Sequence, residues 1–139
     1  MPIFGRKPRA AKPVPPPSAE LPPGEQLERG VAALLLQGRD VIAGTLYMTD
    51  RRLMFEAKRG EARWLTVPYD ELKSVGLYPY ARARMGAPGS MNQCLFIETT
   101  KGEQVWWDFD NRDEAEWLPL VQQHVAGAGR SADDADSRG

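Results

Sequence analysis

The chain has 139 residues, of which 42% are hydrophobic and 27% charged, and its formal net charge is −1. A chain of this size has room for one hydrophobic core, and its balanced charge lacks the excess of Lys and Arg that generic nucleic-acid binding requires. Its one cysteine excludes an intramolecular disulfide, and its apolar runs are too short to span a membrane. The first residues lack the apolar stretch of a secretion signal, so we expect a reducing, cytoplasmic location.

The two ends of the chain differ in composition from its middle. Residues 1–23 contain eight of the 12 prolines and carry a net charge of +3, and residues 126–139 consist of Gly, Ala, Ser, Asp and Arg. Neither segment has enough large apolar side chains to offset the entropy that is lost on ordering. We therefore expect a disordered tail at each end of one domain, which spans residues 24–125.

Within this domain, apolar residues occur in short runs separated by turn residues, which is typical of β-strands. In one run Leu53, Phe55 and Ala57 share a face. Gly44 interrupts the run before it and predicts a bulge or close packing. Seven strands at this spacing predict a sandwich or a barrel. The predicted strands span residues 31–37, 41–48, 52–58, 62–67, 74–80, 92–99 and 103–110.

The apolar period changes to that of a helix after the last strand. Asn111 and Glu114 have the spacing of a capping box, and Gly127 predicts the end of the helix. Pro119 predicts a kink or a restart, because proline has no N–H for the helical ladder. One helix face is expected to pack against two aromatic residues of the last strand. That face consists of Trp117, Leu118, Val121 and Val125, and the two aromatic residues are Trp107 and Phe109.

Three segments, in their order along the chain, resemble parts of the GRAM domains, which are members of the PH-like superfold. Residues 44–55 (GTLYMTDRRLMF) resemble the signature hairpin of the family, and residues 68–75 (PYDELKSV) resemble its proline–acidic–apolar–Lys–Ser–Val step. An apolar strand, a Gly turn at residues 101–102, an aromatic strand and a helix complete the series. The resemblance implies a mostly β fold, in which seven strands form a strongly bent, PH-like sandwich or barrel capped by one C-terminal α-helix. It also implies a stand-alone, bacterial-type member that docks to lipids or proteins and does not catalyse a reaction.

The residues themselves give little support to catalysis. His124 is the only histidine, and we expect a structural role for it near the end of the helix. Cys94 lies in a predicted strand beside apolar residues, the usual setting of an unreactive thiol. The acidic cluster at residues 108–114 lacks the spacing of a calcium loop, and no phosphate- or dinucleotide-binding motif is present. We predict no catalytic residue, no metal site and no cofactor.

The segment 78–91, which ends the fifth predicted strand and includes a connection longer than a hairpin needs, combines Tyr, Arg and Met, which are common in protein interfaces. It is either an interaction surface or a simple insertion. Trp106 points away from the core-facing Trp107, so it is either covered by a neighbouring segment or available for contact. The predicted partner contacts are Tyr78, Tyr80, Arg82, Arg84, Met85 and Trp106. Our leading hypothesis is a protein-interaction or adaptor module with an unidentified protein partner.

Basic residues in the turns at one end of the predicted sheet suggest an alternative, a peripheral membrane module that recognises anionic lipid. These residues are Arg39, Lys58, Arg59, Arg63 and Lys101. Three acidic residues oppose them, and a surplus of two charges is small for a phosphoinositide site. The N-terminal tail could add a weak attraction to a membrane through its basic residues, or bind a partner through Pro13–Pro17. A small-ligand carrier with a cavity between sheet and helix is a third hypothesis, and the oligomeric state stays open.

Overall fold

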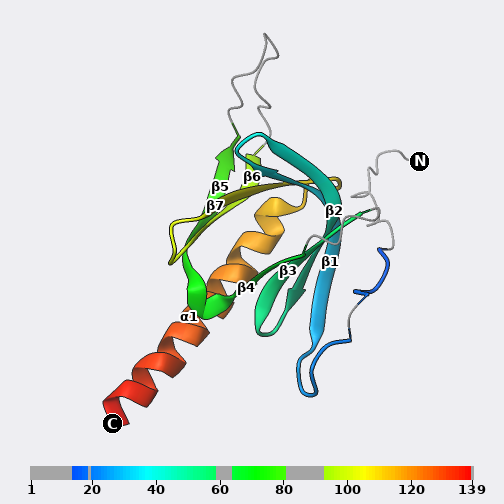
Figure 1. Cartoon of the computed structure of the whole chain (residues 1–139). Coiled ribbons are helices and arrows are strands. Elements are labelled where there is room, and N and C mark those ends of the chain that lie inside the picture. Colours follow the sequence, from blue (N-terminus) through cyan, green and yellow to red (C-terminus); the bar gives the residue numbers. More distant parts are fainter. Residues whose placement is uncertain (1–13, 19, 59–63, 81–92, 139) are drawn as a thin grey trace, which may run out of the picture.

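The computed structural model describes residues 14–18, 20–58, 64–80 and 93–138 (Figure 1). All seven predicted strands are present, each within a few residues of its predicted bounds. The strands are β1 (Leu27–Gln37), β2 (Asp40–Thr49), β3 (Arg52–Ala57), β4 (Trp64–Pro68), β5 (Leu72–Pro79), β6 (Gln93–Thr99) and β7 (Gln104–Phe109). A single 3₁₀ turn, η1 (Tyr69–Glu71), joins β4 to β5, and the helix α1 (Glu114–Arg138) follows β7.

The strands form one antiparallel sheet in the order β4-β3-β2-β1-β7-β6-β5. β1 pairs with β2 over its whole length but with β7 only from Ala33 to Leu36. The N-terminal part of β1 therefore pairs with β2 but not with β7, and the sheet bends at this strand. Figure 1 shows the sheet curled around α1. The predicted bent sheet capped by a C-terminal helix is confirmed.

The core lies between the concave face of this sheet and α1. Alternate residues of β2, β3, β6 and β7 point into it, as period-two alternation requires. Trp117 and Val121 of α1 are buried against them, and the ring of Trp117 meets that of Phe109 edge-on at 4.9 Å between centroids. Leu118 and Val125 are partly buried at the border of the same cluster. The predicted helix face is confirmed.

Gly44 settles the choice between a bulge and close packing. It pairs in regular register with Ala33 on β1 and with Ala57 on β3, so the ladder has no bulge there. A Cβ at Gly44 would lie 2.3 Å from the backbone carbonyl oxygen of Glu56 and 2.6 Å from the ring of Phe55. The glycine is therefore required by the approach of β3.

The ends of α1 differ from the sequence expectation. The carboxylate of Glu114 accepts a hydrogen bond from the N–H of Phe109 at 2.7 Å, so the predicted capping box with Asn111 is wrong. Asn111 instead accepts a bond from the N–H of Asp113, one residue before the helix. α1 is one helix through Pro119, without the predicted restart, and it continues past Gly127 to Arg138. Within the described residues, no helix is long and apolar enough to cross a bilayer.

Part of the predicted N-terminal tail lies on the sheet. The backbone carbonyl of Pro15 accepts a hydrogen bond from the hydroxyl of Tyr47 at 2.6 Å, and Ser18 donates to the carboxylate of Glu56. Residues 14–18 thus have defined contacts and α1 runs past residue 126, whereas the domain bounds 24–125 stay a prediction. Residues 1–13 lie outside the described part of the chain.

Candidate functional site

The outer face of β5, β6 and β7 carries a continuous line of aromatic rings. Phe96 of β6 and Trp106 of β7 are register partners, and their ring centroids are 4.9 Å apart. Tyr78 meets Phe96 edge-on at 5.4 Å, and Tyr80 lies 4.9 Å from Trp106 on the other side. We call these four residues the aromatic row: Tyr78, Phe96, Trp106 and Tyr80.

Strand alternation explains why these rings face outward. Leu95 and Ile97 of β6 point into the core, so Phe96 between them points away, and Trp106 likewise alternates with the buried Trp107. The hydroxyl of Tyr80 donates to the carbonyl of Gly38 at 2.6 Å, which ties the end of β5 to the β1–β2 turn. The row is therefore held in place by both its strands and this cross-link.

The aromatic row is a partly exposed surface. Tyr78 is 55% exposed, whereas Trp106 and Phe96 are half-buried between their neighbours. The indole Nε1 of Trp106 is itself buried, and among the described residues it has no hydrogen-bond acceptor, so the hydroxyl of Tyr78 is the exposed polar edge of the row. Exposed aromatic rings with a polar edge are the side chains that protein interfaces favour.

Three of the predicted partner contacts come together in this row. Tyr78, Tyr80 and Trp106 all belong to it, whereas the predicted contacts Arg82, Arg84 and Met85 lie outside the described residues. Phe96, the ring that connects Tyr78 to Trp106, was not among the predicted contacts. The signal was its position between two core-facing residues of β6, which places it on the same outer face as Trp106.

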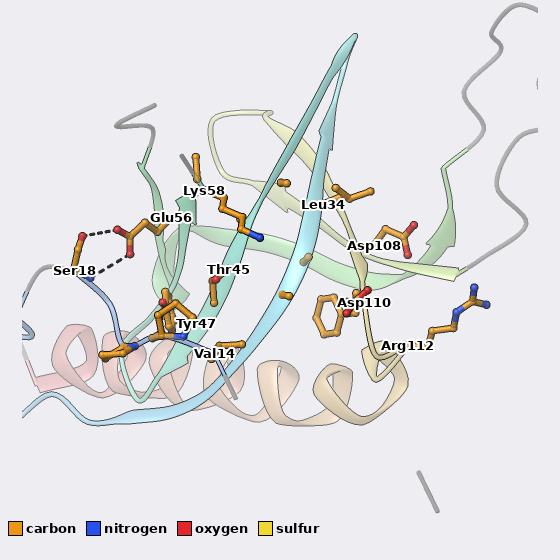
Figure 2. Close-up of a pocket in the computed structure, with 18 residues that line it drawn as sticks. Val14, Ser18, Leu34, Thr45, Tyr47, Glu56, Lys58, Asp108, Asp110 and Arg112 are labelled. Carbon is orange, nitrogen blue, oxygen red and sulfur yellow. Dashed lines mark hydrogen bonds between the residues drawn. The ribbon is translucent and has the colours of Figure 1, made fainter. Parts of the chain in front are cut away.

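A second surface, the outer groove, lies on the outer face of β1, β2 and β3 next to Val14–Ser18 and has a volume of about 710 Å³. Its floor contains the small side chains of Ala32, Ala43 and Thr45. Figure 2 shows Val14 and Tyr47 at one end of the groove and Asp108, Asp110 and Arg112 at the other. Burial raises the pKa of Asp108, and the nearby charge of Arg112 offsets part of this rise.

Three of the five predicted basic contacts, Arg39, Lys58 and Lys101, belong to the described residues. Of these three only Lys58 lines the groove, whereas Arg39 lies in the β1–β2 turn and Lys101 in the β6–β7 turn. Arg59 and Arg63 lie outside the described residues. The groove also carries acidic side chains, so the described residues give it no surplus of positive charge.

His124 packs where α1 crosses η1. Its ring stacks on that of Tyr69 with centroids 4.6 Å apart, and its Nε2 lies 2.8 Å from the carboxylate of Glu28. Tyr69 and His124 border a second pocket of about 600 Å³ between α1 and the β2–β3 turn. Because His124 joins the helix to β1 and η1, its contacts are those of a structural residue. Here it lies in the middle of α1 and not near its end, because the helix continues past Gly127.

The remaining reactive groups are embedded in the fold. Cys94 is fully buried on β6, and burial raises the pKa of its thiol to about 11. A thiol with such a pKa is almost entirely protonated near neutral pH and is a poor nucleophile. Among the described residues, no group of three or more His, Cys, Asp or Glu side chains is placed to hold a metal ion.

No protein-family model and no curated protein match this sequence. Solved structures do match its fold. The Vps36 N-terminal PH domain aligns with a TM-score of 0.60 and 15% identity, covering 78% of this chain and 85% of that one. The hSac2 domain from human phosphoinositide phosphatase Sac2 aligns with a TM-score of 0.53 and 14% identity, covering 74% and 73%.

A further match is the C-terminal domain of an unknown protein from Leishmania infantum. It aligns with a TM-score of 0.55 and 21% identity and covers 73% of this chain and 86% of that one. Together with the sheet order and the closing helix, these likenesses show that the chain has a PH-like fold.

Proposed function

We propose that this PH-like module is a non-catalytic adaptor domain that binds a protein partner through the aromatic row. The observation that carries the proposal is the row itself, four aromatic side chains in ring contact on an outer sheet face, with Tyr78 more than half exposed. The finer assignment to the GRAM family, which is part of this proposal, is supported by the three quoted segments. A cytoplasmic location belongs to it as well, supported by the single buried cysteine.

The chemistry of the row favours a protein partner over a lipid headgroup. Tyr and Trp present large, rigid contact areas at low entropic cost and dominate the energetics of many protein interfaces. A phosphorylated headgroup instead requires converging cations, whereas Lys58 shares the outer groove with the acidic Glu56, Asp108 and Asp110. Anionic lipid therefore remains the alternative, to be separated by experiment.

The test uses the full chain with an affinity tag, returned to its native cells. Wild type is expected to recover a partner in saturable amounts, and Tyr78→Ser is expected to recover at least about tenfold less, as at an interface hot spot. Thr66→Ser is the matched control, because Thr66 is exposed on β4, at the opposite edge of the sheet. Equal recovery by the two variants would contradict the proposal.

Sedimentation with vesicles that contain phosphatidylserine, at two salt concentrations, tests the alternative. The proposal predicts little binding by wild type at either concentration. Salt-sensitive binding that is lost on Lys58→Ala and Arg39→Ala, and kept by Tyr78→Ser, would favour a lipid-binding function instead.

A further inference from the structure

The chain carries a proline-rich segment and, in the same molecule, a groove that holds part of it. Val14, Pro15, Pro16 and Ser18 line the outer groove together with residues of β1, β2 and β3 (Figure 2). We propose that the outer groove is a binding site for extended, proline-rich peptides, and that Val14–Ser18 is its resident occupant. The proposal rests on other residues than the aromatic row and does not depend on the proposed function.

Three separate contacts hold the segment Val14–Ser18 against the sheet. The hydroxyl of Tyr47 donates to the backbone carbonyl of Pro15 at 2.6 Å. Ser18 donates twice to the carboxylate of Glu56, from its backbone N–H at 3.2 Å and from its hydroxyl. Figure 2 shows both bonds to Glu56 and places Val14 beside Tyr47. The carbonyl of Pro15 thus contacts Tyr47, Ser18 contacts Glu56, and the side chain of Val14 contacts a third part of the sheet.

The third part is a notch at Gly30, the register partner of Tyr47. A Cβ at Gly30 would come within 2.9 Å of the Val14 side chain and 3.2 Å of the Tyr47 ring. The missing side chain therefore makes room for both. Tyr47 is only 1% exposed although it points away from the core, because the segment covers it.

These contacts match the chemistry of a proline-rich ligand. Such a segment favours the extended polyproline conformation, which loses little entropy on binding and leaves its backbone carbonyls unpaired. The hydroxyl of Tyr47 satisfies one such carbonyl in the groove, that of Pro15. Burial raises the pKa of Tyr47, so its hydroxyl remains protonated and available as the donor.

The outer groove has more room than the segment fills. Its volume of about 710 Å³ extends from the segment past Thr45 to Lys58 and Asp108 (Figure 2). A partner peptide that continues beyond the residues equivalent to Val14–Ser18 could use this space. The extra contacts would let it compete with the resident segment.

The segment Val14–Ser18 occupies the outer groove for most of the time because it is covalently connected to β1. Residues 19–26 join it to β1, and a short linker holds a segment at an effective concentration on the order of 1 mM. If the intrinsic dissociation constant is about 0.1 mM, the segment fills the groove about nine-tenths of the time and weakens a competing peptide about tenfold. The groove would thus be closed until the segment is displaced.

The test measures fluorescence anisotropy of a labelled peptide with the sequence of residues 12–20, added to the full chain. In the released variant, Val14→Asp/Ser18→Asp, one new carboxylate meets the apolar notch and the other meets Glu56. The control, Ala10→Asp/Ala11→Asp, changes the net charge equally outside the described contacts. The released variant is expected to bind the peptide about tenfold more tightly than wild type or the control.

Two further measurements show where the peptide binds. Tyr47→Phe in the released variant is expected to weaken peptide binding about fivefold, through the loss of one hydrogen bond. A peptide carrying the Ser18→Asp change is expected to bind the released variant more weakly, because it brings a carboxylate to Glu56. This second measurement does not depend on the folding of a Tyr47 variant.

Equal peptide binding by wild type and the released variant would overturn the proposal. Peptide binding that is weakened neither by Tyr47→Phe in the protein nor by Ser18→Asp in the peptide would also overturn it. Light scattering is recorded in parallel. A wild-type dimer that dissociates on addition of the peptide would mean that the segment belongs to a second copy, which would also overturn its assignment as the resident of its own groove.

Discussion

Gly44 shows how a single missing side chain fixes the spacing of two strands. A Cβ there would lie 2.3 Å from a backbone oxygen of β3, and that oxygen cannot move aside as a flexible side chain can. We expect Gly44→Ala to destabilise the fold by about 1–3 kcal/mol, as overpacking does. Urea denaturation at neutral pH measures this loss.

The matched control is Gly127→Ala in α1, where an added Cβ would have no neighbour within 4 Å. It is expected to leave stability unchanged or to raise it by roughly 0.5–1 kcal/mol, because glycine is a poor helix former. If both variants were equally stable, the close contact at Gly44 would not limit the packing of β2 on β3.

Glu25 is a buried carboxylate held by two donors. Its Oε2 accepts bonds from Arg52 Nε at 2.8 Å and from the hydroxyl of Thr49 at 2.7 Å. Burial alone would raise the pKa of Glu25, but the bonds from Arg52 and Thr49 and the charge of Arg52 outweigh burial and lower it. The carboxylate therefore stabilises the fold above the usual glutamate pKa of about 4.3, and this contribution is lost as the pH falls through the lowered folded-state pKa.

We expect Glu25→Gln to cost about 1–3 kcal/mol at pH 7 and progressively less as the pH falls below about 4. Urea denaturation of both proteins at pH 7, 4 and 3 measures the difference between them. This comparison removes the effect of Glu114, whose burial raises its pKa and gives the opposite dependence on pH. A difference that stays constant down to pH 3 would contradict the role of the Glu25 carboxylate.

At the scale of elements, the start of α1 depends on a contact with the strand before it. Glu114 accepts the N–H of Phe109 at 2.7 Å and is itself buried. We expect Glu114→Ala to destabilise the fold by about 1–3 kcal/mol, because it leaves a buried N–H without an acceptor. Glu114→Gln keeps an acceptor oxygen and should lose much less. Thermal unfolding of the two variants measures both losses of stability. If the losses were equal, the hydrogen bond to Phe109 would contribute nothing and the effect would come from packing alone.

The strands were predictable from the sequence because alternation of apolar residues is a local signal. Leu53, Phe55 and Ala57 share a face in the pattern and in the fold. The capping partner of Glu114 was not predictable, because the approach of Phe109 depends on how the chain turns between β7 and α1. Gly127 was misread as a stop, since glycine inside a helix costs only about 1 kcal/mol and does not end it.

At the scale of the whole molecule, the outer surfaces were the least predictable part. Tyr47 and Met54 are register partners on the outer face of the sheet, yet both are buried. The cause at Tyr47 is the segment Val14–Ser18, whose composition predicted disorder. The aromatic row was partly predictable, because Tyr78, Tyr80 and Trp106 stood out by residue type. That Phe96 connects their rings was not predictable, because it depends on the register of β5, β6 and β7.

Crosslinking from Tyr78, the most exposed member of the aromatic row, shows whether the row binds a protein. A photoreactive phenylalanine derivative replaces Tyr78 in the full chain, and the same residue replaces Thr66 on β4 as the control. We predict one crosslinked protein from position 78, suppressed by excess unmodified chain, and none from position 66. The same products from both positions, or no product from position 78, would mean that the aromatic row is not a protein-binding surface.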